Sequence, residues 1–261
     1  MLNRPKLLVS AAILPLLLMA CNPGGLTDPS GTSVSVLFRG AATAASSGLQ
    51  VADTGTLPIE GSNGTLEITA IRAIVSELEL DCDDDATSPC AEFERGPTFV
   101  TVPLGATEVD LADATVPPGR YDEFEFEIED LDWDDDDSAA KRATMDALLT
   151  QIRSTYPDFP SDASLIVEGS FTPTGGDAAS FLTFVEAEIE IELPLVPPLE
   201  VAEGAGPVIV PITIDPSVWF ARPDGSVFDL SAYDYARTGQ IPEIDVEVEG
   251  AFEIDVEFDD D

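Results

Sequence analysis

Apolar and acidic residues alternate in the stretch Gly119–Trp133, which reads GRYDEFEFEIEDLDW. One face carries Tyr121, Glu123, Glu125, Glu127 and Glu129, and the other carries Phe124, Phe126, Ile128 and Asp130. A period of two residues is typical of a β-strand with one buried face and one face in water. The pattern therefore predicts a half-buried strand whose exposed face is acidic.

The same pattern returns at Val185–Leu195 and at Ile244–Phe258, so three strands are expected to expose acidic faces. Like charges opposite one another across a sheet are destabilising. If these strands are neighbours, divalent cations or high salt should stabilise the fold. If they alternate with strands such as Val208–Ile214, the cost is diluted.

A longer strand is predicted at Leu66–Leu80, where the even-numbered positions are mostly apolar. Ile71 and Val75 interrupt its polar face, which indicates a bulge or burial on both sides. Further strands are predicted at Ser33–Phe38, Thr98–Leu104, Val109–Leu111, Ala163–Phe171, Phe181–Leu195, Pro207–Ile214, Ser217–Phe220 and Val227–Leu230. Gly250 is expected to form a bulge in the last strand.

One helix is predicted, at Ser138–Tyr156. Ser138 can cap its first turn and Pro157 stops it. Its apolar stripe consists of Met145, Leu148, Leu149 and Ile152. About ten strands and one inserted helix predict an all-β fold, an antiparallel β-sandwich over residues 32–258.

The N-terminus has the order of regions found in an export signal. Arg4 and Lys6 precede the apolar run Leu7–Met19, and a small residue precedes Cys21. This resembles the lipobox of bacterial lipoproteins, in which residues 1–20 are removed and Cys21 is lipidated. Residues 21–31 would then form a flexible tether. Asn22 favours the outer membrane within the cell envelope. An ordinary secretory signal beside a coincidental cysteine is the alternative.

The chain is strongly acidic, with a formal net charge of −40. This charge argues against binding nucleic acid or an anionic membrane surface, and favours cations or basic partners. Adaptation to salt is an equally good explanation. Histidine is absent from the sequence, which removes the usual general base near neutral pH and excludes a Ser–His–Asp triad. We therefore expect a protein that is not an enzyme, with a carboxylate-based hydrolase as the remaining catalytic alternative.

Cys82 and Cys90 are expected to form a disulfide in an oxidising compartment, because no other soft ligand is available to complete a metal site with them. Around them, Asp81, Asp83, Asp85 and Glu92 match the spacing of a calcium loop. Ala86 stands where such loops need glycine, so a solvated acidic loop is the competing interpretation.

Two other acidic clusters are weaker candidates for cation sites. The series Asp130, Asp132, Asp134 and Asp136 fails the calcium-loop pattern at Lys141, and Asp259–Asp261 forms an acidic tail. Weak, millimolar-range calcium association is favoured over a tight site. Aromatic residues could instead line a carbohydrate or partner site, although in a sandwich they more often belong to the core. These residues are Trp133, Trp219, Phe220, Tyr233 and Tyr235.

Four segments together resemble a family of bacterial lipoproteins that carries a domain of unknown function. They are Leu66–Leu80, Gly96–Leu104, Val116–Tyr121 and Ile214–Phe220. The resemblance implies a transthyretin (prealbumin)-like β-sandwich and an address in the cell envelope, and it brings no catalytic residues. The expected function is a membrane-anchored, non-catalytic binding or structural module. A carbohydrate-binding or adhesion module at the cell surface is the alternative.

Overall fold

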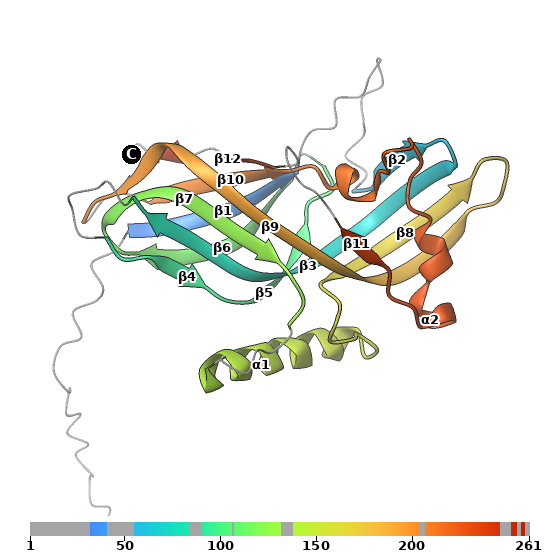
Figure 1. Cartoon of the computed structure of the whole chain (residues 1–261), viewed down its shortest axis with the longest axis horizontal. Helices are drawn as coiled ribbons and strands as arrows, with labels where there is room; N and C mark the ends of the chain where they lie inside the picture. Colours follow the sequence, from blue (N-terminus) through green and yellow to red (C-terminus); the bar gives the residue numbers. More distant parts are fainter. Residues whose placement is uncertain are drawn as a thin grey trace, which may run out of the picture.

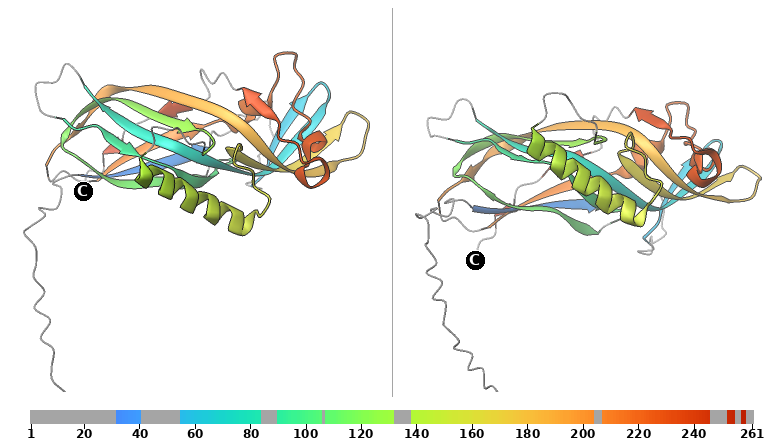
Figure 2. Two further views of the ribbon diagram at one scale, coloured as in Figure 1. Left: turned by 60° about the horizontal axis from the view of Figure 1, so that its bottom comes forward. Right: turned by 90° about the horizontal axis from the view of Figure 1, so that it is seen from below.

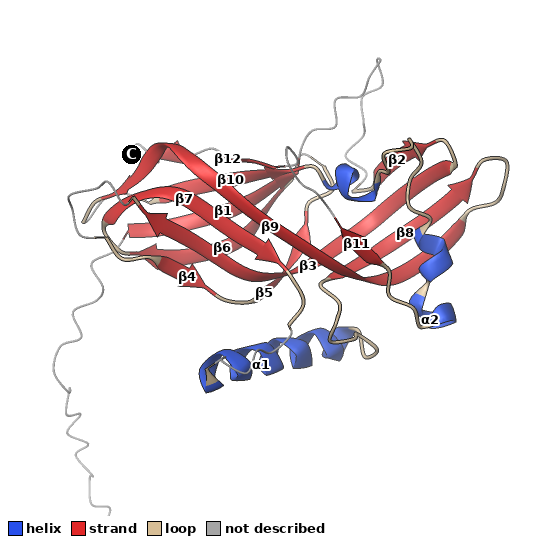
Figure 3. Ribbon diagram, in the orientation of Figure 1, coloured by secondary structure: helices blue, strands red, loops and turns tan. Residues whose placement is uncertain are grey.

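The computed structural model describes residues 32–40, 55–83, 90–105, 107–131, 138–203, 207–245, 252–254 and 257–258. These residues form two β-sheets with few helices, which confirms the predicted all-β class (Figures 1 and 3). The strands are β1 (Thr32–Gly40), β2 (Leu57–Gly61), β3 (Gly64–Cys82), β4 (Phe93–Arg95), β5 (Thr98–Val102), β6 (Glu108–Val116), β7 (Gly119–Ile128), β8 (Leu165–Pro173), β9 (Ala179–Val201), β10 (Val208–Ile214), β11 (Glu243–Asp245), β12 (Phe252–Ile254) and β13 (Glu257–Phe258). The helices are α1 (Ala139–Thr155), α2 (Tyr235–Thr238) and the 3₁₀ turns η1 (Pro216–Phe220) and η2 (Leu230–Tyr233).

The smaller sheet has the strand order β12-β10-β1-β6, with β13 also paired to β10. The larger sheet follows the order β11-β9-β7-β3-β2 and also contains β4, β5 and β8. Residues from both sheets belong to one apolar core, and Figure 2 shows the sheets as two layers. Within this core the rings of Phe38 on β1 and Phe126 on β7 meet edge to face, 5.6 Å apart.

Most strand pairs are antiparallel, as expected, but two are parallel. β1 runs parallel to β10, with Val34 opposite Val208, and β11 runs parallel to β9. The expectation of a purely antiparallel sandwich is therefore wrong at these two pairs. In the first, the N-terminal strand pairs with a strand from the last quarter of the chain, a long-range contact that periodicity does not reveal.

β3 is a long strand that pairs with most of the other strands of the larger sheet. Its first part pairs with β2 and β8, and its second part pairs with β5, β4 and β7. Irregularities in register fall between Ile68 and Ala70 and between Val75 and Glu77. Ile74 and Val75 are both buried, on opposite faces, because α1 covers one side of the sheet there. The predicted bulge and two-sided burial are confirmed.

α1 agrees with the predicted helix. The Ser138 side chain accepts a hydrogen bond from the Lys141 backbone N–H, and Tyr156 ends the helix. The four predicted apolar residues are its buried ones, and they pack on the outer face of the larger sheet with Ile74 and Phe184 (Figure 2). The helix thus closes a second, smaller core outside the two-sheet layer.

The strand predicted at Gly119–Trp133 is shorter than expected, because β7 ends at Ile128 where the chain leaves the sheet towards α1. Tyr121 is buried rather than sharing the glutamate face. Relative to β3, β7 has one extra residue between Tyr121 and Glu123, and this bulge reverses the facing. The Tyr121 hydroxyl lies 2.9 Å from the Pro117 carbonyl oxygen and 3.0 Å from that of Ala91.

Two short predicted strands are wrong. Ser217–Phe220 lies in η1, because Pro216 begins the turn and the Asp215 carboxylate accepts a hydrogen bond from the Ser217 N–H. In Val227–Leu230, only Val227 makes an isolated bridge, to Ala221. The predicted last strand is divided between the sheets, since β11 pairs with β9 whereas β12 and β13 pair with β10. Gly250 lies outside the described residues.

Candidate functional site

Two of the three acidic strands predicted from the sequence are neighbours in the larger sheet, and only the start of the third joins them there. β7 lies between β3 and β9, and β11 lies beside β9. Their apolar residues, such as Phe126, Leu78 and Ile191, are buried in the shared core. Since neighbouring residues of a strand point to opposite faces, the glutamates between them must point outwards.

We call this surface the acidic face. It comprises Glu77, Glu79, Asp81, Glu94, Glu123, Glu125, Glu127, Glu186, Glu188, Glu190, Glu192 and Glu243. The register aligns these residues in rows that run across the strands. One row joins Glu94, Glu79, Glu125 and Glu192, each opposite the next. A second row joins Glu77, Glu127 and Glu190.

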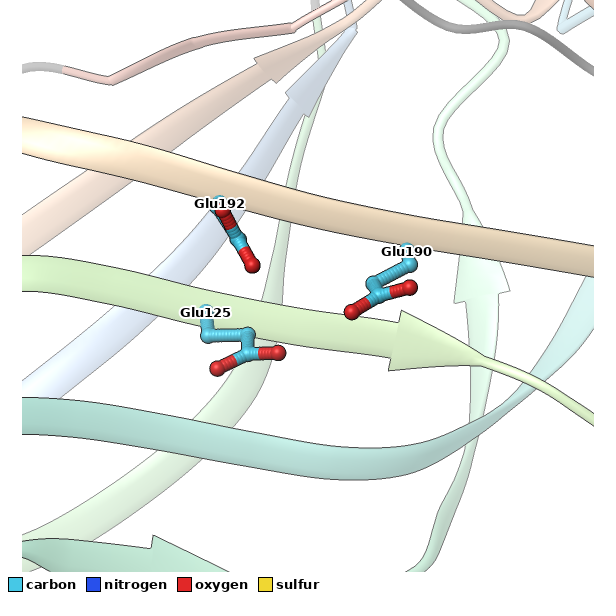
Figure 4. A group of neighbouring side chains, drawn as sticks. All are labelled: Glu125, Glu190 and Glu192. Carbon is cyan, nitrogen blue, oxygen red and sulfur yellow. The ribbon is translucent and has the colours of Figure 1, made fainter.

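Three carboxylates converge within these rows (Figure 4). Glu125 of β7 and Glu190 and Glu192 of β9 each offer an oxygen, and these oxygens lie within 4.8 Å of one another. The oxygens around one calcium ion lie up to about 5 Å apart, twice the usual Ca–O distance. Among the described residues, these three are the acidic, histidine or cysteine side chains that lie close enough together to share a metal ion.

Burial, and after it the repulsion between neighbouring carboxylates, raises the pKa of several carboxyl groups on the acidic face. Partial burial, followed by the charges of Asp81, Glu77, Glu125 and Glu94, raises the pKa of Glu79 to about 7. Burial and the charge of Glu192 are the two largest causes that raise the pKa of Glu125. The face therefore binds protons more readily than isolated glutamates do.

A pocket of about 260 Å³ lies where β7 ends, next to the three converging carboxylates. Its lining is Glu127, Ile128, Glu129, Glu188, Ile189 and Glu190. Burial and the neighbouring Glu127 charge raise the pKa of Glu129, whereas Lys141 on α1 lowers it. The lining of the pocket is therefore mainly acidic.

The residues of the predicted calcium loop have separate surroundings. Asp81 lies opposite Glu123 on the acidic face. The Asp83 carboxylate is 3.1 Å from Nε of Arg120, and its side chain is 8% exposed. Glu92 is exposed, and Asp85 lies outside the described residues. A calcium site in this loop stays a prediction.

The predicted disulfide between Cys82 and Cys90 is present, with 5.8 Å between the two Cα atoms. Cys21 and the remaining predicted cation clusters lie outside the described residues, apart from Asp130. No helix among the described residues is long and apolar enough to cross a membrane.

The aromatic residues contribute to packing. Trp219 and Phe220 are buried in the main core. Tyr235 is half-buried, with its ring 4.7 Å from that of Phe184. Tyr233 is half-buried in η2, and Trp133 lies outside the described residues. The described aromatics named above therefore form no exposed strip of the kind that binds sugars.

Sequence reasoning identified the acidic faces but missed the cluster of Glu125, Glu190 and Glu192. The sequence signal for this cluster is the alternation of glutamate and apolar residues in two stretches. This alternation predicts a cluster only when the two strands are known to be adjacent and in register. Comparisons with protein families, with curated proteins and with solved structures found no match to this chain.

Proposed function

We propose that this chain is an exported lipoprotein, anchored through Cys21, whose acidic face binds divalent cations weakly and without catalysis. The observation that carries the proposal is the alignment of carboxylates across β3, β7 and β9, with Glu125, Glu190 and Glu192 converging. We further propose that the two sheets form an immunoglobulin- or transthyretin-like sandwich. Their shared core supports this assignment.

Electrostatics favours a cation on this face. Each facing pair of carboxylates costs a few tenths of a kcal/mol to about 1 kcal/mol. An ion that bridges two or three of them removes this repulsion in the folded state only, and so stabilises it. Calcium prefers carboxylate oxygens and accepts irregular geometry, whereas magnesium demands a near-ideal octahedron. An exposed site of this kind fits millimolar affinity.

The proposed location in the cell envelope is based on the N-terminal sequence, in which a basic region is followed by an apolar run and then by a cysteine. A tether at residues 21–31 would connect the lipid to β1, which begins at Thr32. A protein held in this way presents its acidic face to the medium outside the membrane. Basic partners could then bind to the same surface as cations.

The test is thermal unfolding of the mature chain in chelator, in millimolar calcium, and in sodium chloride at matched ionic strength. Calcium should raise Tm beyond sodium chloride, and replacing the three converging glutamates by glutamine should remove the difference. Glutamine at Glu60, Glu67 and Glu203 provides a control with the same change in charge. Equal effects of both salts would overturn cation binding and leave a salt-adapted scaffold.

The pocket beside Glu129 favours one other function, a carboxylate-based hydrolase. A carboxyl group with a raised pKa can act as a general acid, with a second carboxylate beside it. If this were the function, a panel of glycosides would be hydrolysed and Glu129→Gln would abolish the activity without changing the calcium-dependent Tm. Absence of turnover across the panel would leave the non-catalytic function.

A further inference from the structure

Asparagine is rare in this chain, and one of the few copies stands in a chemically labile position. The sequence contains Asn3, Asn22 and Asn63. Only Asn63 is followed by glycine, in the turn between β2 and β3 where Gly61 pairs with Gly64. Asparagine is a thermolabile residue. A following glycine increases the lability, because it has no side chain to hinder attack of its backbone nitrogen on the asparagine amide.

The fold requires both residues of this dipeptide. A Cβ atom at Gly64 would collide with the Thr172 carbonyl oxygen and lie 2.8 Å from Cα of Pro173. The Asn63 side chain donates to the Val227 carbonyl and accepts from the Val227 N–H, both at 2.9 Å. A carboxylate cannot donate, and an ammonium group cannot accept. The packing therefore keeps a reactive Asn–Gly pair in the sequence.

Deamidation of Asn63 consumes only water. The Gly64 nitrogen bonds to Cγ of Asn63, and the Nδ2 group leaves as ammonia with the proton from the Gly64 N–H. Water then opens the cyclic imide. Attack at Cγ gives aspartate, and attack at the main-chain carbonyl carbon gives isoaspartate. We propose that Asn63 is a deamidation site that the folded protein keeps unreactive by pairing its amide with Val227.

The pairing opposes the reaction because ring closure moves Cγ onto the Gly64 nitrogen and so breaks both bonds to Val227. The backbone of the turn is also held. The Ser62 N–H donates to the Gly225 carbonyl at 2.9 Å, and the Asn63 carbonyl accepts from the Thr174 N–H at 3.0 Å. Reaction therefore requires a local opening of the turn, of the kind that frees backbone groups for exchange.

The products cannot restore the pairing. Aspartate keeps the acceptor for the Val227 N–H but has no group to donate to the Val227 carbonyl. Isoaspartate also lengthens the backbone of the turn by one carbon atom. Each deamidation is therefore permanent and makes the next opening of the turn easier. This inference does not depend on cation binding or on lipidation.

The experiment follows deamidation of the mature chain in mildly alkaline buffer, with and without urea above the unfolding midpoint. Peptide mapping by mass spectrometry measures the fraction of residue 63 that has become acidic. The folded protein should react at least about tenfold more slowly, because both bonds must open first. Asn22 provides an internal reference, since Pro23 has no N–H and cannot form the imide. Equal rates in the two buffers, or no reaction in urea, would overturn the inference.

Two variants test whether the pairing is the protecting element. Gly225 and Gly239 both have positive φ angles and open space where a Cβ would stand, but only Gly225 belongs to the turn that contacts Ser62. Gly225→Ala strains that turn and should speed deamidation of the folded protein several-fold. Gly239→Ala carries the same kind of strain elsewhere and should react like the wild type. Equal rates for the two variants would overturn the protective role of the pairing.

Discussion

The side chain of Ser164 forms two hydrogen bonds with the backbone of Ala187. Its hydroxyl donates to the Ala187 carbonyl at 2.7 Å and accepts from the Ala187 N–H at 2.9 Å. Ser164 is fully buried, in the interval where the insertion of α1 separates β7 from β8. Its backbone also bonds to Ile74 on one side and Val185 on the other. A single serine thus completes the sheet between β3 and β9.

Replacing Ser164 by alanine should be strongly destabilising, because the N–H and the carbonyl of Ala187 would be buried without partners. The expected loss in the free energy of unfolding is about 2 kcal/mol or more. Urea denaturation measures it. Ser180→Ala, at an exposed position of β9, should change the same free energy by less than about 0.5 kcal/mol. Similar losses for the two variants would contradict the role of Ser164.

The stability of the fold should depend on the side-chain amide of Asn63. Nδ2 donates to the Val227 carbonyl and Oδ1 accepts from the Val227 N–H, both at 2.9 Å. Asn63→Asp keeps the acceptor but has no group to donate to the Val227 carbonyl, and should cost about 1–2 kcal/mol near neutral pH. Ser62→Ala, in the same turn, leaves both bonds in place and should be close to neutral. Calorimetric Tm values would reveal the difference, and equal values would argue against the pairing.

The cost of adding a side chain at Gly119 should depend on whether the disulfide is present. A Cβ atom at Gly119 would lie 2.5 Å from Sγ of Cys90. Gly119→Ala should therefore lower the unfolding free energy of the oxidised protein, by about 1–3 kcal/mol. In a Cys82→Ser/Cys90→Ser background, which itself should cost about 2–3 kcal/mol, part of that loss should disappear. A double-mutant cycle in denaturant measures the coupling, and additive losses would rule it out.

Reversing one charge in the central row should stabilise the protein. Glu125→Lys would face Glu79 and Glu192 and turn two repulsive pairs into attractive ones. The expected gain is about 0.5–1 kcal/mol at low salt, and it should shrink in 1 M sodium chloride because salt screens exposed charges. Glu67→Lys makes the same change in net charge away from the acidic face. If it gave an equal gain, the effect would be one of net charge rather than of facing pairs.

Local signals in the sequence were sufficient to predict most elements and which of their side chains are buried. α1 could be predicted because its signals act within a few residues. They are the cap at Ser138, the apolar stripe that includes Leu148, and the stop at Pro157. The pairing of β1 with β10 could not be predicted, since no local pattern encodes a contact between distant segments. The residues of η1 have β propensity and therefore predict a strand, whereas Pro216 and the Asp215 cap decide the observed conformation.

The candidate site was predictable only in part. Alternation showed which residues leave the core, and so it predicted glutamates on an exposed face. It did not show that Glu125 stands opposite Glu192, because register depends on turns and bulges elsewhere in the sheet. The bulge beside Tyr121 is such a case, where one extra residue moves an aromatic ring from the expected face into the core.

The pairing of β1 with β10 sets an order of events in folding. The Thr32 hydroxyl bonds to the Ala202 carbonyl, 170 residues away, and the adjoining strand pair is similarly distant. The smaller sheet cannot assemble until nearly the whole chain is available. Folds dominated by such distant contacts form slowly, in milliseconds to seconds. If the chain is exported as proposed, its smaller sheet can therefore form only after β10 has crossed the membrane.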